Sequence, residues 1–173
     1  MKKFAIVTGA SKGLGRAFSL ELGSRGINTI LVSLPGEDIH VLNDEIIQKF
    51  GTTSVYFEVD LSDYDNVISF TKTINEQYSV FLLINNAGIG GTMKFEDATV
   101  NLVNKIVQLN VMAVSVLTRQ LIPNLASQSQ SFVLNISSLD TLKLLKSKVS
   151  FKLSLLGETP FGTSQYTLLI SIS

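Results

Sequence analysis

The chain has 173 residues, of which 45% are apolar, and its 14 Lys and Arg residues balance its 14 Asp and Glu residues. This length suits one domain with a sizeable core, and a zero net charge without a basic tract argues against a nucleic-acid partner. The lack of cysteine excludes disulfides and thiolate chemistry, and no uninterrupted apolar run approaches the roughly 20 residues of a membrane span. We therefore expect a cytoplasmic protein with no membrane partner.

Apolar runs of strand length alternate along the chain with segments of helical periodicity. The expected strands are 4–7, 28–33, 54–59, 80–84 and 132–136, and the expected helices are 14–26, 38–50, 64–77 and 99–121. Ser62 is the expected N-cap of the third helix. This alternation predicts right-handed crossovers and an α/β fold, in which helices cover both faces of a doubly wound parallel sheet of about five strands.

The most informative stretch is the glycine-rich turn at 8–15, Thr-Gly-Ala-Ser-Lys-Gly-Leu-Gly, between the first strand and the first helix. Glycine permits a positive φ and lets a ligand approach the backbone, and the following helix directs free N–H groups and its positive dipole end at an anion. The turn therefore predicts a cradle for the phosphates of a dinucleotide. Its Gly-x-x-x-Gly-x-Gly spacing alone is also typical of a purely structural turn.

Four further motifs follow the turn in order: Asp60-Leu61, Asn85-Asn86-Ala87-Gly88, Asn110, and Asn135-Ile136-Ser137-Ser138. Together with the turn, they resemble the short-chain dehydrogenase/reductase family, in register from about Lys3 to Ser138. The resemblance implies a three-layer Rossmann fold that binds NAD(P) in residues 1–138. Residues 139–173 then form an atypical C-terminal tail.

The resemblance also implies a role for each matching residue. The residues carried over to cofactor binding are Thr8, Gly9, Ser11, Lys12, Gly13, Leu14, Gly15, Ser33, Asp60, Leu61, Asn86, Ala87 and Gly88. The three glycines of the turn match the pyrophosphate site, Asp60 matches the adenine contact, and 86–88 match the loop beside the adenosine ribose. Asn110 matches the catalytic asparagine that holds a helix kink and a relay water, and Ser138 matches the serine that orients the substrate carbonyl. Taken alone, Asp60 is equally a helix-start residue.

The residues near the second strand favour NADP(H) over NAD(H). NAD-preferring members usually carry an acidic residue at the end of that strand, where this chain has Ser33 and Leu34, and Glu37 follows only beyond the Pro-Gly pair at 35–36. Lys12 resembles the basic residue of NADP-preferring members. Its ammonium is suited to a 2′-phosphate, with the Ser33 hydroxyl as a second donor. The alternative is that Lys12 is a solvated turn residue.

The chain departs from the family pattern after Ser138. The family uses Tyr-x-x-x-Lys about thirteen residues later, where a tyrosinate acts as acid/base and the lysine lowers its pKa. Phe151 and Leu155 stand at those positions, and Tyr166 is followed four residues later by Ile170. We interpret the chain as truncated or frameshifted after the serine. Loss of the family's later strands predicts an exposed edge at the fifth strand, unless the tail covers part of it.

Two functions follow from the resemblance. The first is an oxidoreductase that transfers hydride between NADP(H) and a carbonyl or alcohol substrate, which is a small molecule. The second is a catalytically inactive dinucleotide-binding remnant or regulator, which the missing Tyr and Lys favour. A structural module that binds nothing would leave the ordered motifs unexplained. The family also forms homo-oligomers, partly through the long helix, and the sequence leaves this state open. His40 is expected to be a solvated helix residue, and no metal site is expected.

Overall fold

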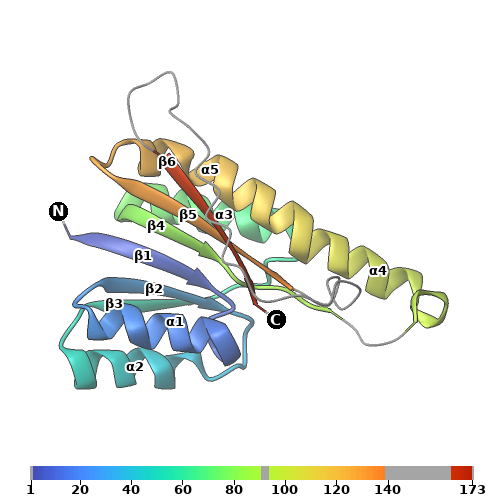
Figure 1. Ribbon diagram of the computed structural model, residues 1–173, viewed down its shortest axis with the longest axis horizontal. Coiled ribbons are helices and arrows are strands. Elements are labelled where there is room, and N and C mark those ends of the chain that lie inside the picture. The colour runs from blue at the N-terminus through green and yellow to red at the C-terminus, as the bar shows by residue number, and fades with distance from the viewer. Residues whose placement is uncertain (1, 91–93, 139–164, 173) are drawn as a thin grey trace.

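The computed structural model describes residues 2–90, 94–138 and 165–172. They form a parallel sheet with helices on both faces (Figure 1), which confirms the predicted α/β, doubly wound fold. The strand order is β3-β2-β1-β4-β5-β6. The strands are β1 (Lys3–Thr8), β2 (Asn28–Ser33), β3 (Ser54–Glu58), β4 (Ser79–Asn85), β5 (Ser131–Ser138) and β6 (Gln165–Ile172).

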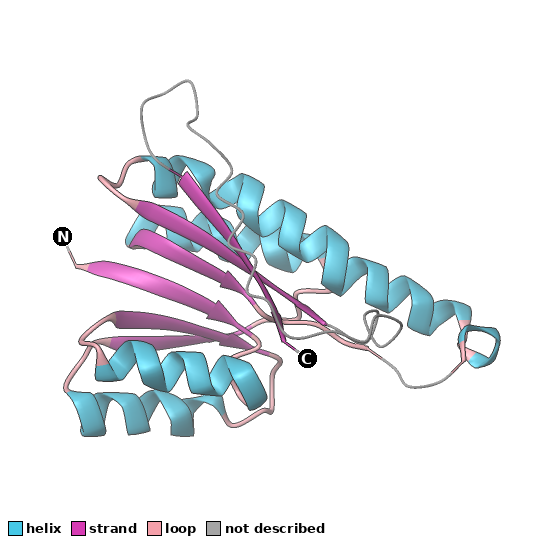
Figure 2. Ribbon diagram, in the orientation of Figure 1, coloured by secondary structure: helices cyan, strands magenta, loops and turns pink. Residues whose placement is uncertain are grey.

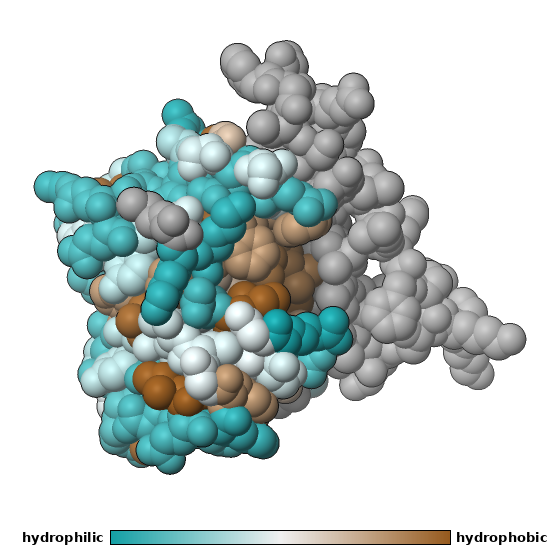
Figure 3. Space-filling model, turned by 90° about the vertical axis from the view of Figure 1, so that its left-hand side faces the viewer, coloured by the Kyte–Doolittle hydropathy of each residue, from teal (hydrophilic) through white to brown (hydrophobic). Residues whose placement is uncertain are grey.

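Two helical layers bury the two faces of the sheet (Figure 2). Helices α1 (Gly13–Ser24) and α2 (Ile39–Phe50) cover one face, and α3 (Tyr64–Gln77) and α5 (Val114–Ala126) cover the other. Phe4 and Ile6 pack into the α3–α5 core, whereas Ala5 and Val7 pack into the α1–α2 core. Because both faces of β1 are buried, its sequence is a continuous apolar run. At the amino ends of the strands, the surface is mainly hydrophilic around a central apolar hollow (Figure 3).

The strand order reverses at β1, which pairs with β2 on one side and β4 on the other. In such a sheet the crossovers diverge at this point and leave a crevice outside the carboxyl ends of the strands. The turn after β1 and the loop after β4 meet there, because Thr8 Oγ1 accepts hydrogen bonds from the N–H groups of Asn86 and Ala87 at 2.9 and 3.0 Å. The fold therefore places the glycine turn beside the loop that carries the second motif.

The long helix predicted at 99–121 consists of three segments and extends further. A short 3₁₀ turn, η1 (Phe95–Asp97), precedes it. Helix α4 (Val100–Val107) then passes into a π-helical segment, η2 (Gln108–Ala113), and η2 passes into α5. Pro123 lies inside α5, one turn before its end. Leu117, Leu121 and Leu125 are buried on one face of α5 and hold it against the sheet. The π segment contains Asn110, the residue matched to a helix kink.

Among the described residues, one continuous helical stretch, Val100–Ala126, is long enough and apolar enough to cross a membrane, judged by length and composition alone. The sequence prediction considered only apolar runs, which Lys105 and Arg119 interrupt here, and the absence of a membrane partner stays a prediction. In this structure α5 packs against α3, β4 and β5, as a helix of a layered α/β core does. The cytoplasmic location stays a prediction.

The tail contributes a sixth strand, β6, which covers the edge that β5 would otherwise expose. Strand β6 pairs in parallel with the whole of β5, from Ser131 opposite Gln165 to Ser138 opposite Ile172. This pairing satisfies the backbone groups that an edge strand would leave free. The tail residues 139–164 and 173 lie outside the described residues, so Phe151 and Leu155 have no structural description.

The start of α3 differs from the prediction in its capping residue. Asp63, not Ser62, is the N-cap, and its carboxylate accepts a hydrogen bond from the Asn66 N–H at 3.0 Å. Ser62 instead donates its N–H and its hydroxyl to Asp60 Oδ1, at 2.9 and 2.6 Å. Serine and aspartate are both good N-cap residues. Because Ser62 is hydrogen-bonded to Asp60, the neighbouring Asp63 caps the helix.

Candidate functional site

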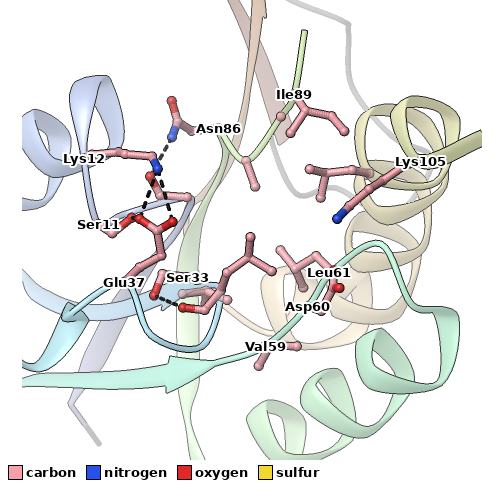
Figure 4. Close-up of a pocket in the computed structure, with 16 residues that line it drawn as sticks. Ser11, Lys12, Ser33, Glu37, Val59, Asp60, Leu61, Asn86, Ile89 and Lys105 are labelled. Carbon is pink, nitrogen blue, oxygen red and sulfur yellow. Dashed lines mark hydrogen bonds and ion pairs between the residues drawn. The ribbon is translucent and has the colours of Figure 1, made fainter. Parts of the chain in front are cut away.

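A cavity of about 280 Å³ lies outside the carboxyl ends of β1 to β4. Figure 4 shows its walls, which come from the glycine turn, the loops after β2, β3 and β4, and the inner side of α4. The predicted cofactor residues that line it are Gly9, Ser11, Lys12, Ser33, Asp60, Leu61, Asn86, Ala87 and Gly88. The structure thus brings together residues that are up to 79 positions apart in the chain, as the hydrogen bond between Thr8 and Ala87 illustrates.

Two glycines hold the turn in its shape because no side chain fits there. Gly9 has φ +63°, and a Cβ on it would lie 2.9 Å from Ala87 Cα. A Cβ on Gly15 would collide with the Gly9 carbonyl oxygen and lie 2.6 Å from Asn86 Nδ2. Asn86 Nδ2 donates to the carbonyl oxygens of Thr8 and Gly9, at 2.9 and 3.1 Å. Gly9, Gly15 and Asn86 therefore form one packed unit beneath the turn.

Gly13 has the opposite environment, open rather than packed. Its φ is +56°, and a Cβ on it would meet nothing within 4 Å. It is the first residue of α1, and the N-cap residue Lys12 makes no side-chain hydrogen bond to the helix. The first N–H groups of α1 therefore have no side-chain cap, which is the arrangement that suits a bound phosphate.

Thr8 lines neither cavity of this site, although the sequence placed it among the cofactor residues. It is 1% exposed, and its hydroxyl donates to the Ile84 carbonyl at 3.2 Å while accepting from the N–H groups of Asn86 and Ala87. Thr8 thus connects β1 to the end of β4. Its role in the structure is to position the glycine turn against the next loop.

The end of the cavity beside β2 carries an ion pair that the sequence did not predict. Lys12 Nζ lies 3.0 and 3.2 Å from the two carboxylate oxygens of Glu37, and Ser11 Oγ lies 3.4 Å from one of them. Figure 4 shows the Glu37 carboxylate turned toward Lys12 and Ser11 at the rim. Ser33 is buried and donates its hydroxyl to the Leu34 carbonyl at 3.1 Å. The loop after β2 therefore supplies a carboxylate at this rim.

The opposite wall carries Asp60, Leu61 and Lys105 (Figure 4). The pKa of Asp60 is lowered, first by the hydrogen bond from the Ser62 hydroxyl, and also by the Ser62 N–H and the nearby positive charge of Lys105, while partial burial opposes the shift. The carboxylate is therefore charged at neutral pH. Its second oxygen, Oδ2, accepts none of the Ser62 bonds.

A second cavity, of about 630 Å³, adjoins the first. Both are lined by Asn86, Ala87, Gly88 and Ile89, so the loop after β4 separates them. Leu14, Asn110 and Asn135 line only the second. The two cavities thus lie next to each other at the carboxyl edge of the sheet, where folds of this kind bind their ligands.

Asn110 is fixed by two hydrogen bonds to one backbone position. Its Oδ1 accepts from the Ile89 N–H at 3.0 Å, and its Nδ2 donates to the Ile89 carbonyl at 2.8 Å. The π segment carries this side chain toward the loop after β4, and such segments are frequent at functional sites. Asn110 thus joins the long helix to the loop.

Two amide side chains, Asn85 and Asn135, are among the residues that line the second cavity. Asn85 Nδ2 donates to Asn135 Oδ1 at 2.8 Å and to Thr118 Oγ1 at 3.2 Å. Asn85 Oδ1 is buried and has no hydrogen-bond partner among the described residues. Ser138, the proposed substrate-orienting residue, ends β5 on the same carboxyl edge; only its backbone is described.

Sequence reasoning missed Glu37, Ile89, Lys105 and Leu109 as lining residues. The Pro-Gly pair at 35–36 predicts a turn before Glu37, but a turn signal does not predict which distant side chain the next residue will contact. Within the described residues, no three His, Cys, Asp or Glu side chains are placed to hold a metal ion. His40 is exposed on α2, as predicted.

The geometry and the family comparison agree. The family model for short chain dehydrogenase matches residues 3–151, which is most of the chain. The chain belongs to the short chain dehydrogenase family. Its glycine turn, its Asn-Asn-Ala-Gly loop and Asn110 therefore occupy a fold that this oxidoreductase family shares.

The curated relatives include very-long-chain 3-oxoacyl-CoA reductases. The one from Mus musculus is 29% identical over 141 residues, a match that covers 79% of this chain and 45% of the relative. The one from Pyrenophora tritici-repentis is 31% identical over 144 residues, which are 78% of this chain and 41% of the relative. The chain thus spans less than half the length of these relatives.

Solved structures of the family superpose well on this chain. A metagenomic short-chain oxidoreductase in complex with NADP is 27% identical, with a TM-score of 0.72, over 78% of this chain and 61% of that one. A short-chain dehydrogenase from Sphingobium yanoikuyae in complex with NADPH has a TM-score of 0.75 at 21% identity, over 95% of this chain and 58% of that one. The second likeness shows the shared fold.

Proposed function

We propose that this chain binds NADP(H) along the carboxyl edge of its sheet and belongs to an oxidoreductase that transfers hydride between the cofactor and a carbonyl or alcohol substrate. The observation that carries the proposal is the uncapped amino end of α1, beside the open space at Gly13. The relatives named as 3-oxoacyl-CoA reductases and the similar oxidoreductase in complex with NADP support it.

The residues fit a dinucleotide part by part. The N–H groups at the start of α1 would hold the pyrophosphate, Asp60 and Leu61 would lie against the adenine, and the loop 86–88 would pass between the adenosine half and the nicotinamide half. The bound cofactor supplies the hydride. Ser138, which ends β5 at the same carboxyl edge, would orient the carbonyl. Asn110 would keep the loop after β4 in place, because both polar atoms of its side chain are bonded to Ile89.

The preference for NADP over NAD is part of the proposal. Lys12 lies at the rim beside β2, where the adenosine ribose of the cofactor would lie, and its side chain is 78% exposed. Similar family structures hold NADP or NADPH. Lys12 would therefore bind the 2′-phosphate as a point charge.

A second candidate function is dinucleotide binding without turnover. None of the four tyrosines in the sequence is followed four residues later by lysine, since Asp60, Ile68, Leu82 and Ile170 occupy those positions. A carbonyl reduction needs a proton donor within hydrogen-bond reach of the substrate oxygen. Under this reading the chain binds the cofactor as a remnant or regulator.

The test is a titration of NADPH fluorescence followed by a carbonyl-reduction assay over a broad substrate panel. Gly13→Asp and Gly13→Asn form a matched pair, because both side chains tolerate positive φ and the site is open. The added carboxylate at the phosphate site should weaken NADPH binding at least about tenfold more than the neutral amide. Equal affinities of the two variants would contradict the proposed phosphate site. Binding with turnover supports the oxidoreductase, whereas binding without turnover supports the second candidate.

A further inference from the structure

Lys12 and Glu37 form an ion pair at the rim of the first cavity. Among the described residues that line this cavity, they are the only oppositely charged side chains in contact. Both oxygens of the carboxylate lie within 3.2 Å of Lys12 Nζ. The proposed function needs that ammonium for the 2′-phosphate. A phosphate and Glu37 are both anions, so they would compete for the same cation.

The backbone after β2 determines where Glu37 lies. Pro35 and Gly36 form a turn in which Gly36 has φ +79°, and the Gly36 N–H donates to Glu58 Oε1 of β3 at 3.0 Å. The next residue, Glu37, therefore lies at the mouth of the cavity, where Ser11 Oγ is a further neighbour of its carboxylate at 3.4 Å. The Glu37 side chain is 32% exposed, so its carboxylate can be solvated when Lys12 changes partner.

The chain contains a second ion pair of the same kind away from the cavity. Arg16 of α1 pairs with Glu45 of α2, and their side chains are 44% and 34% exposed. Neither residue lines either of the two cavities. Glu45 is therefore a matched control for Glu37, because both carboxylates join the α1 region to the β2–α2 region and are about equally exposed.

We propose that Glu37 weakens the preference of this site for NADP(H) over NAD(H) by competing with the 2′-phosphate for Lys12. The inference rests on the proposed dinucleotide binding and deepens it. With NADP(H) bound, Lys12 exchanges the carboxylate for the phosphate, and Glu37 repels the added charge from the rim. With NAD(H) bound, the Lys12–Glu37 pair stays intact and the carboxylate faces uncharged ribose hydroxyls. Glu37 therefore reduces the preference for NADP that Lys12 alone would give.

The experiment measures the dissociation constants of NADPH and NADH for the wild-type chain, Glu37→Gln, Glu45→Gln, Lys12→Met and the double variant Lys12→Met/Glu37→Gln. Glu37→Gln should tighten NADPH binding about threefold to tenfold, the range expected when an exposed ion pair and one like-charge contact are removed. NADH binding should stay unchanged or weaken. Glu45→Gln should leave the ratio of the two constants as in the wild type.

The double variant tests whether Lys12 is the shared partner. Lys12→Met should weaken NADPH binding more in the Glu37→Gln background than in the wild type, because only there is the ammonium free before binding. An unchanged ratio in Glu37→Gln, or a shift toward NADH, overturns the inference while leaving dinucleotide binding intact. Failure of every variant and of the wild type to bind either cofactor overturns the proposed function and this inference together. Circular dichroism melting curves confirm that each variant is folded.

Discussion

Replacing Thr8 by valine removes a hydroxyl that takes part in three hydrogen bonds while keeping the shape of the side chain. Thr8 is 1% exposed, and its Oγ1 serves the Ile84 carbonyl and the N–H groups of Asn86 and Ala87. Valine leaves two N–H donors without an acceptor, at roughly 1–3 kcal/mol for each that stays unsatisfied. We expect Thr8→Val to lower the free energy of unfolding by about 3 kcal/mol.

The matched control is Thr8→Ser, which keeps the hydroxyl and loses one buried methyl, at about 1 kcal/mol. Urea denaturation measures both variants. With a slope near 2 kcal/mol/M, the midpoint should fall by about 1.5 M for valine and about 0.5 M for serine. A serine variant as unstable as the valine variant would refute the reasoning, because the methyl and not the hydrogen bonds would then hold the two loops together.

Three further predictions concern single side chains. Asn110→Ala should lower the free energy of unfolding by about 1–2 kcal/mol in urea denaturation, because the Ile89 backbone loses two partners; an unchanged midpoint contradicts this. Gly15→Ala should destabilise the fold by about 3 kcal/mol and weaken NADPH binding, since the added methyl collides with backbone; wild-type stability would show that the turn yields. Ser62→Ala should raise the pKa of Asp60 toward its ordinary value in an NMR titration. Because the wild-type pKa is lowered, this carboxylate stabilises the fold at neutral pH and loses that effect as the pH falls through the lowered pKa. The variant should therefore lose less stability on acidification, and equal losses would contradict the assignment.

The sequence predicted the layers and most of the cavity wall because these depend on local patterns. A strand buried on both faces has to be apolar throughout, as 4–7 is, and the loops at the carboxyl ends of neighbouring parallel strands have to meet. The same local reasoning was wrong for Ser62, where two residues could cap α3 and tertiary contacts selected Asp63. Local reasoning also did not show that the hydroxyl of Thr8 is hydrogen-bonded within the fold, and the role of Thr8 at the cofactor stays a prediction.

By itself, the sequence determined the alternation of strands and helices, the glycine turn at the start of α1, and the family, because apolar period and glycine position are properties of neighbouring residues. Only the tertiary structure decided which distant residues became partners. Glu37 meets Lys12 because a turn after β2 returns across the sheet edge, and β6 pairs with β5 because that edge had unpaired backbone groups. Such partners depend on the strand order and on the path of each loop, and neither can be predicted from the local pattern of apolar and polar residues.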